Sequence, residues 1–163
     1  MPEKDWIIKK ISVSYDGVFD LNSLIKLIKG WLSKNYYFMY EKNYGDVQKD
    51  KNLSDIKIDI DSEREVDDYN RAHIDVKIKI KDLHNVNVNN KKLQKGQLKV
   101  EFESFLKKDI HSEWEVKPWL KILRAIYDRF LYNDKQKVIE EDLKAETYAI
   151  YSEVKSYLNL LNR

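Results

Sequence analysis

The feature that most constrains this chain is the alternation of apolar and charged residues in three runs, at roughly 56–66, 72–82 and 97–106. A period of two residues is typical of a β-strand that buries one face and exposes the other. The connections between the runs are short and polar, which favours antiparallel neighbours in a meander. The side chains expected to face the core are Ile56, Ile58, Ile60, Ile74, Val76, Ile78, Ile80, Leu98, Val100 and Phe102.

The outward positions of these runs carry charge in blocks, acidic in the first run, basic in the second and acidic in the third. Opposite charges would then face each other across neighbouring strands, where each pair contributes about 0.2–1 kcal/mol and disfavours slipped registers. We interpret this pattern as control of register and solubility, with a charged docking surface as the alternative. The residues are Asp59, Asp61, Glu63, Glu65, Lys77, Lys79, Lys81, Glu101 and Glu103.

The N-terminal part predicts one strand followed by one helix. Apolar residues alternate with polar ones at 11–15, which indicates a half-buried strand, and Asp16-Gly17 predicts a turn after it. From there, apolar residues recur at every third or fourth position over about 21–34. This spacing places them on one stripe of an amphipathic helix.

Two polar residues frame this helix. Asp20 is placed to cap its start, and Asn35 to end it, because asparagine tolerates the left-handed conformation found at helix C-termini. The aromatic run at 36–40 favours a second strand. The polar, aperiodic segment at 43–54 is predicted to be a loop.

Two helices are predicted after the last strand. Pro118 suits the first turn of a helix that runs to about residue 131, and Asn133-Asp134 separates it from a longer helix over about 136–161. The predicted order is therefore β-α-β-β-β-β-α-α in a single α+β domain spanning 1–163. We expect an antiparallel meander of about five strands, with the N-terminal helix and both C-terminal helices packed on one face.

A long C-terminal helix over a curved antiparallel sheet resembles the outline of helix-grip, START-like domains. The resemblance lies in the order of elements, and the chain departs from that pattern by having fewer strands and two C-terminal helices. It implies an apolar ligand held between the sheet and the C-terminal helix. The side chains that would line such a cavity are Phe38, Tyr40, Phe102 and Tyr127.

The composition argues against catalysis. The chain has no cysteine, three histidines and four scattered glycines, and it contains no glycine-rich phosphate loop or nucleophile motif. The triplet Asp109-x-His111-x-Glu113 is better explained as an exposed hairpin tip than as a metal site. The carboxylates come in runs beside lysines, as on a solvated face. We expect no enzymatic activity, no cofactor and no metal.

Several aromatic residues are candidates for contacts with a partner. Trp114 and Trp119 flank the entry to the C-terminal helices, and tryptophan is enriched at interfaces. Tyr148 and Tyr151 widen the apolar stripe of the long helix, which suggests a partner helix or a homodimer. The aromatic run at 36–40 is expected to be mainly core, with stacking on RNA bases as an alternative.

These observations favour a small non-enzymatic interaction or assembly module that binds another macromolecule. A protein partner or a second copy is favoured over nucleic acid, since the net charge is only +2. The alternatives are a START-like carrier or sensor of a small apolar ligand, and an RNA- or ribosome-associated protein. No run approaches the ~18–20 apolar residues of a membrane span, so we expect no span and a cytoplasmic location.

Overall fold

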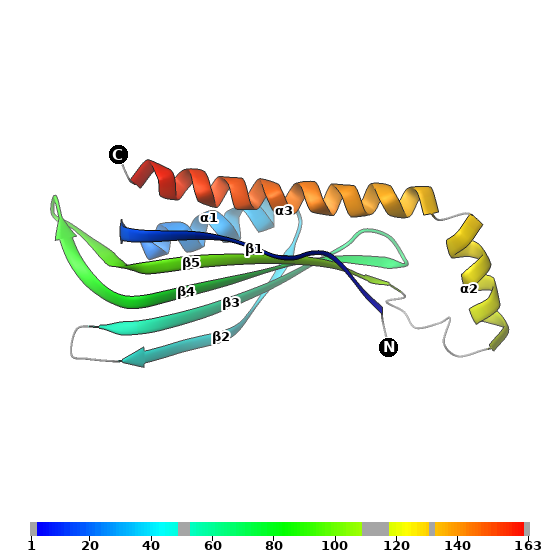
Figure 1. Cartoon of the computed structure of the whole chain (residues 1–163), viewed down its shortest axis with the longest axis horizontal. Helices are drawn as coiled ribbons and strands as arrows, with labels where there is room; N and C mark the ends of the chain where they lie inside the picture. Colours follow the sequence, from blue (N-terminus) through cyan, green and yellow to red (C-terminus); the bar gives the residue numbers. More distant parts are fainter. Residues whose placement is uncertain (1–2, 49–52, 109–117, 131–132, 162–163) are drawn as a thin grey trace.

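A computed structural model describes residues 3–48, 53–108, 118–130 and 133–161. It shows an α+β fold, in which helices α1 and α3 lie along one face of a five-stranded antiparallel sheet (Figure 1). The opposite face, called the open face below, is not covered by any described helix or strand. The elements are β1 (Glu3–Phe19), α1 (Leu21–Lys34), β2 (Phe38–Gln48), β3 (Ser54–Glu65), β4 (Asn70–Val88), β5 (Lys91–Lys108), α2 (Pro118–Phe130) and α3 (Asn133–Leu161).

The strand order is β1-β5-β4-β3-β2, with antiparallel pairing throughout. The predicted meander is therefore confirmed for β2 to β5. β1, however, pairs with β5 rather than with its sequence neighbour β2, so these two strands form opposite edges of the sheet. The chain passes from one edge to the other through α1, which lies on the same side of the sheet as α3 (Figure 1).

The core lies between the sheet and the two helices that cover it. All ten side chains predicted to face inward are buried, and Phe102 is among those with no exposed area. The apolar stripe of α1 contributes Leu24, Ile28 and Leu32. The stripe of α3 has a gap between Leu143 and Ile150, which the buried Thr147 fills by donating its hydroxyl to the Leu143 carbonyl at 2.7 Å.

The cap predicted at the start of α1 is confirmed. The Asp20 carboxylate accepts hydrogen bonds from the backbone N–H groups of Asn22 and Ser23, at 3.1 and 3.4 Å. At the other end Asn35 closes the helix differently from the prediction. Its own backbone is not left-handed; its side-chain amide donates to the Trp31 carbonyl at 2.8 Å, and the positive φ of 66° belongs to Tyr36.

Three predicted breaks in the sheet are wrong. Asp16-Gly17 is not a turn, because β1 continues to Phe19. The segment predicted as a loop from residue 43 is strand as far as Gln48, paired along β3. The polar connection before the third alternating run shrinks to a tight turn at Asn89-Asn90, where both residues have positive φ, as a type I′ hairpin turn requires.

α2 departs most from the prediction. It does not join the layer that α1 and α3 form on the sheet; it lies beyond the end of the sheet and meets α3 (Figure 1). Two helices rather than three therefore cover the inner face. The apolar stripe that predicted a core helix here is not in the core.

Three side chains from separate elements fasten α3 to the sheet. The Arg64 guanidinium on β3 lies 2.9 Å from the Glu146 carboxylate on α3, and it also donates to the Asn35 carbonyl at 3.0 Å. The buried Tyr37 donates its hydroxyl to the same carboxylate. Burial, followed by this hydrogen bond, raises the pKa of Tyr37, so its hydroxyl stays protonated as the donor.

We expect Glu146→Ala to lower the free energy of unfolding by about 1–3 kcal/mol, because it leaves Arg64 and Tyr37 without their shared acceptor. Urea unfolding at neutral pH measures this. Glu141→Ala, which removes an exposed carboxylate from the same helix, is the matched control and should change stability by less than about 0.5 kcal/mol. Equal effects of the two substitutions would show that the contact does not fasten α3.

Candidate binding surfaces

The first candidate surface is the apolar side of α2. Trp119, Ile122, Leu123 and Ile126 are 57, 65, 44 and 49% exposed, although their spacing is that of a buried helix face. Positions i, i+3, i+4 and i+7 lie on one stripe of an α-helix. Clusters of exposed apolar side chains are uncommon on monomeric proteins, so this stripe makes α2 a candidate contact surface.

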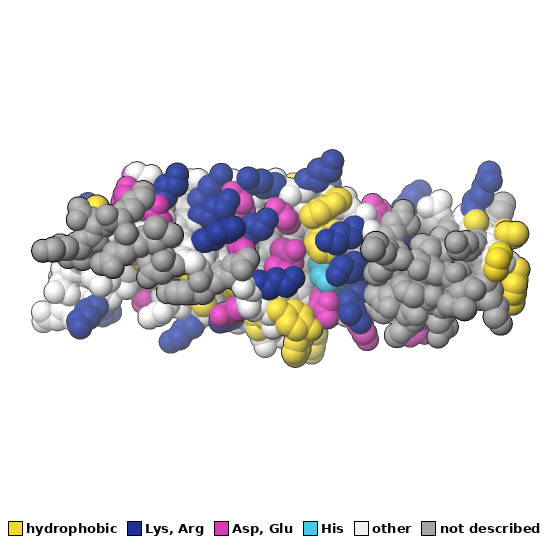
Figure 2. Space-filling model, turned by 90° about the horizontal axis from the view of Figure 1, so that it is seen from below, with side chains coloured by type: hydrophobic (Ala, Val, Ile, Leu, Met, Phe, Trp, Pro, Cys, Tyr) yellow, Lys and Arg dark blue, Asp and Glu magenta, His cyan; other side chains and the backbone are white. Residues whose placement is uncertain are grey.

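The second candidate surface is the open face of the sheet, where charge is arranged in rows across β3, β4 and β5. Figure 2 shows lysine and arginine side chains concentrated over one part of this face, with acidic and apolar side chains beside them. The predicted alternation of opposite charges is confirmed in one row only. In chain order of the strands, the rows are Lys57–Lys79–Lys99, Asp59–Lys77–Glu101 and Asp61–Asp75–Glu103.

The all-acidic row perturbs the carboxyl group at its centre. Burial, followed by repulsion from the Asp61 and Glu103 carboxylates, raises the pKa of Asp75 to about 6. One of its oxygens, Oδ1, is buried and accepts no hydrogen bond from the described residues. Asp75 is therefore a group that changes charge close to neutral pH.

A pocket of about 290 Å³ lies beside this row, and His73 is its most buried titratable side chain. The imidazole stacks on the Phe105 ring, with 4.6 Å between centroids and 6° between planes. Its Nε2 lies 3.7 Å from a Glu63 oxygen. Burial, followed by the positive charges of Lys107 and Arg71, lowers the pKa of His73 to about 3, so the ring is neutral at pH 7.

A neutral histidine beside a carboxylate resembles part of a catalytic pair, but such a pair needs a nucleophile or an oriented third group within reach. Two hydroxyl groups line the pocket: that of Ser62 donates to the Ile74 carbonyl at 2.5 Å, and that of Tyr40 donates to Glu63 at 3.2 Å. Among the described residues, no three His, Asp or Glu side chains are grouped so that they could hold a metal ion.

The four residues predicted to line a ligand cavity do not come together. Phe38 and Tyr40 lie on the open face, 64 and 45% exposed, on the side of the sheet opposite to the expected cavity. Phe102 is in the core, where its ring meets that of Tyr151 edge-on at 6.0 Å. The backbone of Tyr127 is in α2, and its side chain lies outside the described part of the structure.

The residues predicted to contact a partner also separate. Trp119 is exposed on α2, and Tyr148 is 45% exposed on α3. Tyr151 is partly buried and packs against the core, with its ring edge-on to that of Phe102. Trp114, like the triplet around His111, lies outside the described residues.

The prediction from sequence missed two aromatic residues of the open face, Trp6 and Phe105. The ring centroids of Trp6 and Phe105 lie 5.0 Å apart, and the Phe105 ring also stacks on the imidazole of His73. Trp6 precedes the alternating segment recognised at 11–15, and Phe105 occupies an outward position of its run, so neither belonged to a predicted apolar face. The available signal was the alternation itself, since residue 105 lies on the same face as the outward Glu101 and Glu103.

Comparison with known proteins does not add a family. A scan against models of protein families finds none that matches the sequence. A search of curated proteins also finds no match. Within the described ranges, no helix is both long enough and apolar enough to cross a membrane.

The raised pKa of Asp75 predicts how stability depends on pH. A carboxyl whose folded-state pKa lies above its unfolded value near 3.8 contributes stability below that value and loses it as the pH rises through about 6. Asp75→Asn removes this loss. We expect the variant to be more stable than the wild type by about 1–2 kcal/mol at pH 8, allowing for solvent screening, and to show no such advantage at pH 4.

Urea unfolding of the wild type and of Asp75→Asn at pH 4 and pH 8 measures this difference in the free energy of unfolding. The titration of His73 occurs in both proteins and therefore largely cancels in their difference. Asp68→Asn, at an exposed turn position, is the control and should not show the pH-dependent gain. A constant difference between Asp75→Asn and wild type at pH 4 and 8 would contradict the assignment.

Proposed function

We propose that the protein is a small non-enzymatic interaction module that binds another protein through α2. The observation that carries the proposal is the exposure of four apolar side chains on one stripe of this helix: Trp119, Ile122, Leu123 and Ile126. α2 lies beyond the end of the sheet, so a partner can reach this stripe without disturbing the core (Figure 1).

The spacing of these residues supports a specific mode of binding. Anchors at i, i+3, i+4 and i+7 are those with which an amphipathic helix occupies an apolar groove of another protein. A tryptophan among them fits, because tryptophan is enriched among residues that dominate binding energy. A flat contact through 13 residues would bury too little area for a stable dimer, which favours a partner groove that encloses the helix.

The length of α2 supports the same conclusion. Helices shorter than about 12–15 residues are marginal in water unless packing stabilises them. α2 has 13 residues and no place in the sheet–helix layer. We therefore expect it to be weakly stable in the isolated protein and to be stabilised when a partner covers its apolar stripe.

The carrier alternative has less support. Side chains that face each other across the sheet–α3 interface, such as Val76, Phe102, Ile150 and Val154, have no surface accessible to a water-sized probe. A ligand cavity at this position would leave such side chains partly accessible. Two of the four proposed lining residues, Phe38 and Tyr40, are on the other side of the sheet.

We expect Ile122→Asp to abolish binding of the partner without unfolding the protein, since the side chain is 65% exposed. The experiment compares proteins retained from the native host by wild type, by Ile122→Asp and by the control Val138→Asp. Val138 is a similarly exposed apolar residue, 56% exposed, on α3. The expected partner is retained by wild type and control and lost from Ile122→Asp.

Hydrogen exchange provides a test that does not need the partner. The amides of α2 should exchange much faster than those at the centre of α3 in the isolated protein, and slow down in the complex. If both helices are equally protected in a monomer, α2 is stable without a partner and the proposal fails. Retention of only nucleic acid or lipid, or loss of binding in both variants, would also contradict it.

A further inference from the structure

The row of three lysines on the open face is not explained by the stability of the sheet. Lys57, Lys79 and Lys99 lie directly opposite one another on β3, β4 and β5. Like charges in directly opposed cross-strand positions destabilise a sheet. Lysines that protect a sheet from aggregation belong on edge strands, whereas these three strands are internal. A row that costs stability at the centre of a sheet indicates a role in binding.

A single carboxylate, Glu101, holds Lys79 and Lys99 of this row together with Lys10, whereas Lys57 lies 3.7 Å from Asp59 instead. Glu101 is 3% exposed, and its Oε1 lies 3.1 Å from Lys10 Nζ and 3.3 Å from both Lys79 Nζ and Lys99 Nζ. Burial alone would raise the pKa of Glu101, but the hydrogen bonds from these lysines lower it to about 2. It therefore stays ionised and holds three ammonium groups close together. One negative charge compensates only one of the three.

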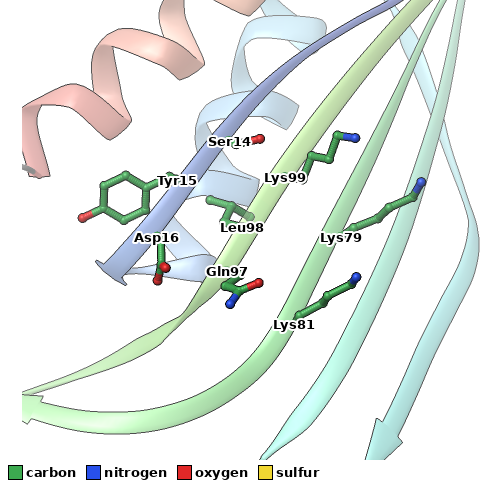
Figure 3. Close-up of a pocket in the computed structure, with 8 residues that line it drawn as sticks. All are labelled: Ser14, Tyr15, Asp16, Lys79, Lys81, Gln97, Leu98 and Lys99. Carbon is green, nitrogen blue, oxygen red and sulfur yellow. The ribbon is translucent and has the colours of Figure 1, made fainter.

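Lys79 and Lys99 also line a pocket together with Lys81, as Figure 3 shows. Lys79, Lys81 and Lys99 point to the same side of the sheet, away from the side chain of Tyr15 and from the helices. The pocket has a volume of about 630 Å³. Ser14 and Gln97 add neutral hydrogen-bonding groups to its lining, and Asp16 at the β1 side is its one carboxylate.

We propose that Lys79, Lys81 and Lys99, of which Glu101 holds Lys79 and Lys99, form a binding site for a ligand with several adjacent phosphate groups. Lysine ammonium groups bind phosphate as point charges, and hydroxyl and amide donors complete such sites. A single phosphate leaves part of the positive charge uncompensated, so the site favours a chain of them. The phosphates can belong to a free oligophosphate or to the backbone of a single nucleic acid strand. This site is separate from α2 and goes beyond the proposed function.

The test is a titration of the isotopically labelled full chain, followed by NMR, with three probes at low salt. The probes are inorganic phosphate, tripolyphosphate and a short oligothymidylate. We expect tripolyphosphate or the oligonucleotide to shift the amides around residues 79–81 and 97–99, and to bind at least tenfold more tightly than phosphate. Binding of both, or of one only, supports the site and shows which source of phosphates it accepts.

The double substitution Lys79→Gln and Lys99→Gln should weaken binding by about tenfold, because it removes two of the ammonium groups. Glu101 keeps its ion pair with Lys10, and the glutamine amides remain hydrogen-bond donors, so we expect the variant to fold. The control is Lys137→Gln with Lys144→Gln, which removes the same charge from exposed positions on α3. The inference fails if neither tripolyphosphate nor oligothymidylate binds, or if both double variants weaken binding equally, since net charge alone would then be responsible.

Discussion

The burial of the sheet's inner face beneath α1 and α3 is the constraint on which the rest of the structure depends. Fully burying an aliphatic side chain contributes about 1.5–3 kcal/mol, and the inner face holds at least seven on β3 and β4 alone. A like-charge pair on the open face costs about 0.2–1 kcal/mol. The inner face therefore determines the register, and the rows of charge on the open face follow from it. A slip of one residue would exchange isoleucines with lysines.

Local pattern predicted most of this fold, because periodicity reports directly which side chains are buried. The alternating runs became β3, β4 and β5, and the stripe at 21–34 became α1. The pairing of β1 with β5 was not predictable in this way, since no local pattern records which distant strand lies alongside. α2 shows the same limit. Its apolar stripe predicts that one helix face is covered, but the sequence does not record whether the sheet or another molecule covers it.

The candidate surfaces were only partly predictable for a related reason. Trp119 was identified by residue type, and its exposure agrees with a role in contact. The lysine row required the register, because Lys57 and Lys99 were not among the outward charges considered from sequence. The surroundings of Asp75 and His73 likewise depend on which residues oppose them on β3 and β5. Side chains of one strand acquire their chemistry from the neighbouring strands.

The pairing of β1 with β5 has a consequence for how the chain reaches its native state. Residues 3–19 are synthesised before their partners at 94–108, which follow about ninety positions later in the chain. Until then β1 has an unpaired edge and an uncovered apolar face, and closing so large a loop is slow. α3, which covers β1, follows β5 in the chain and is therefore synthesised later still. Among the described strands, β1 is thus the one whose partner strand is synthesised furthest behind it.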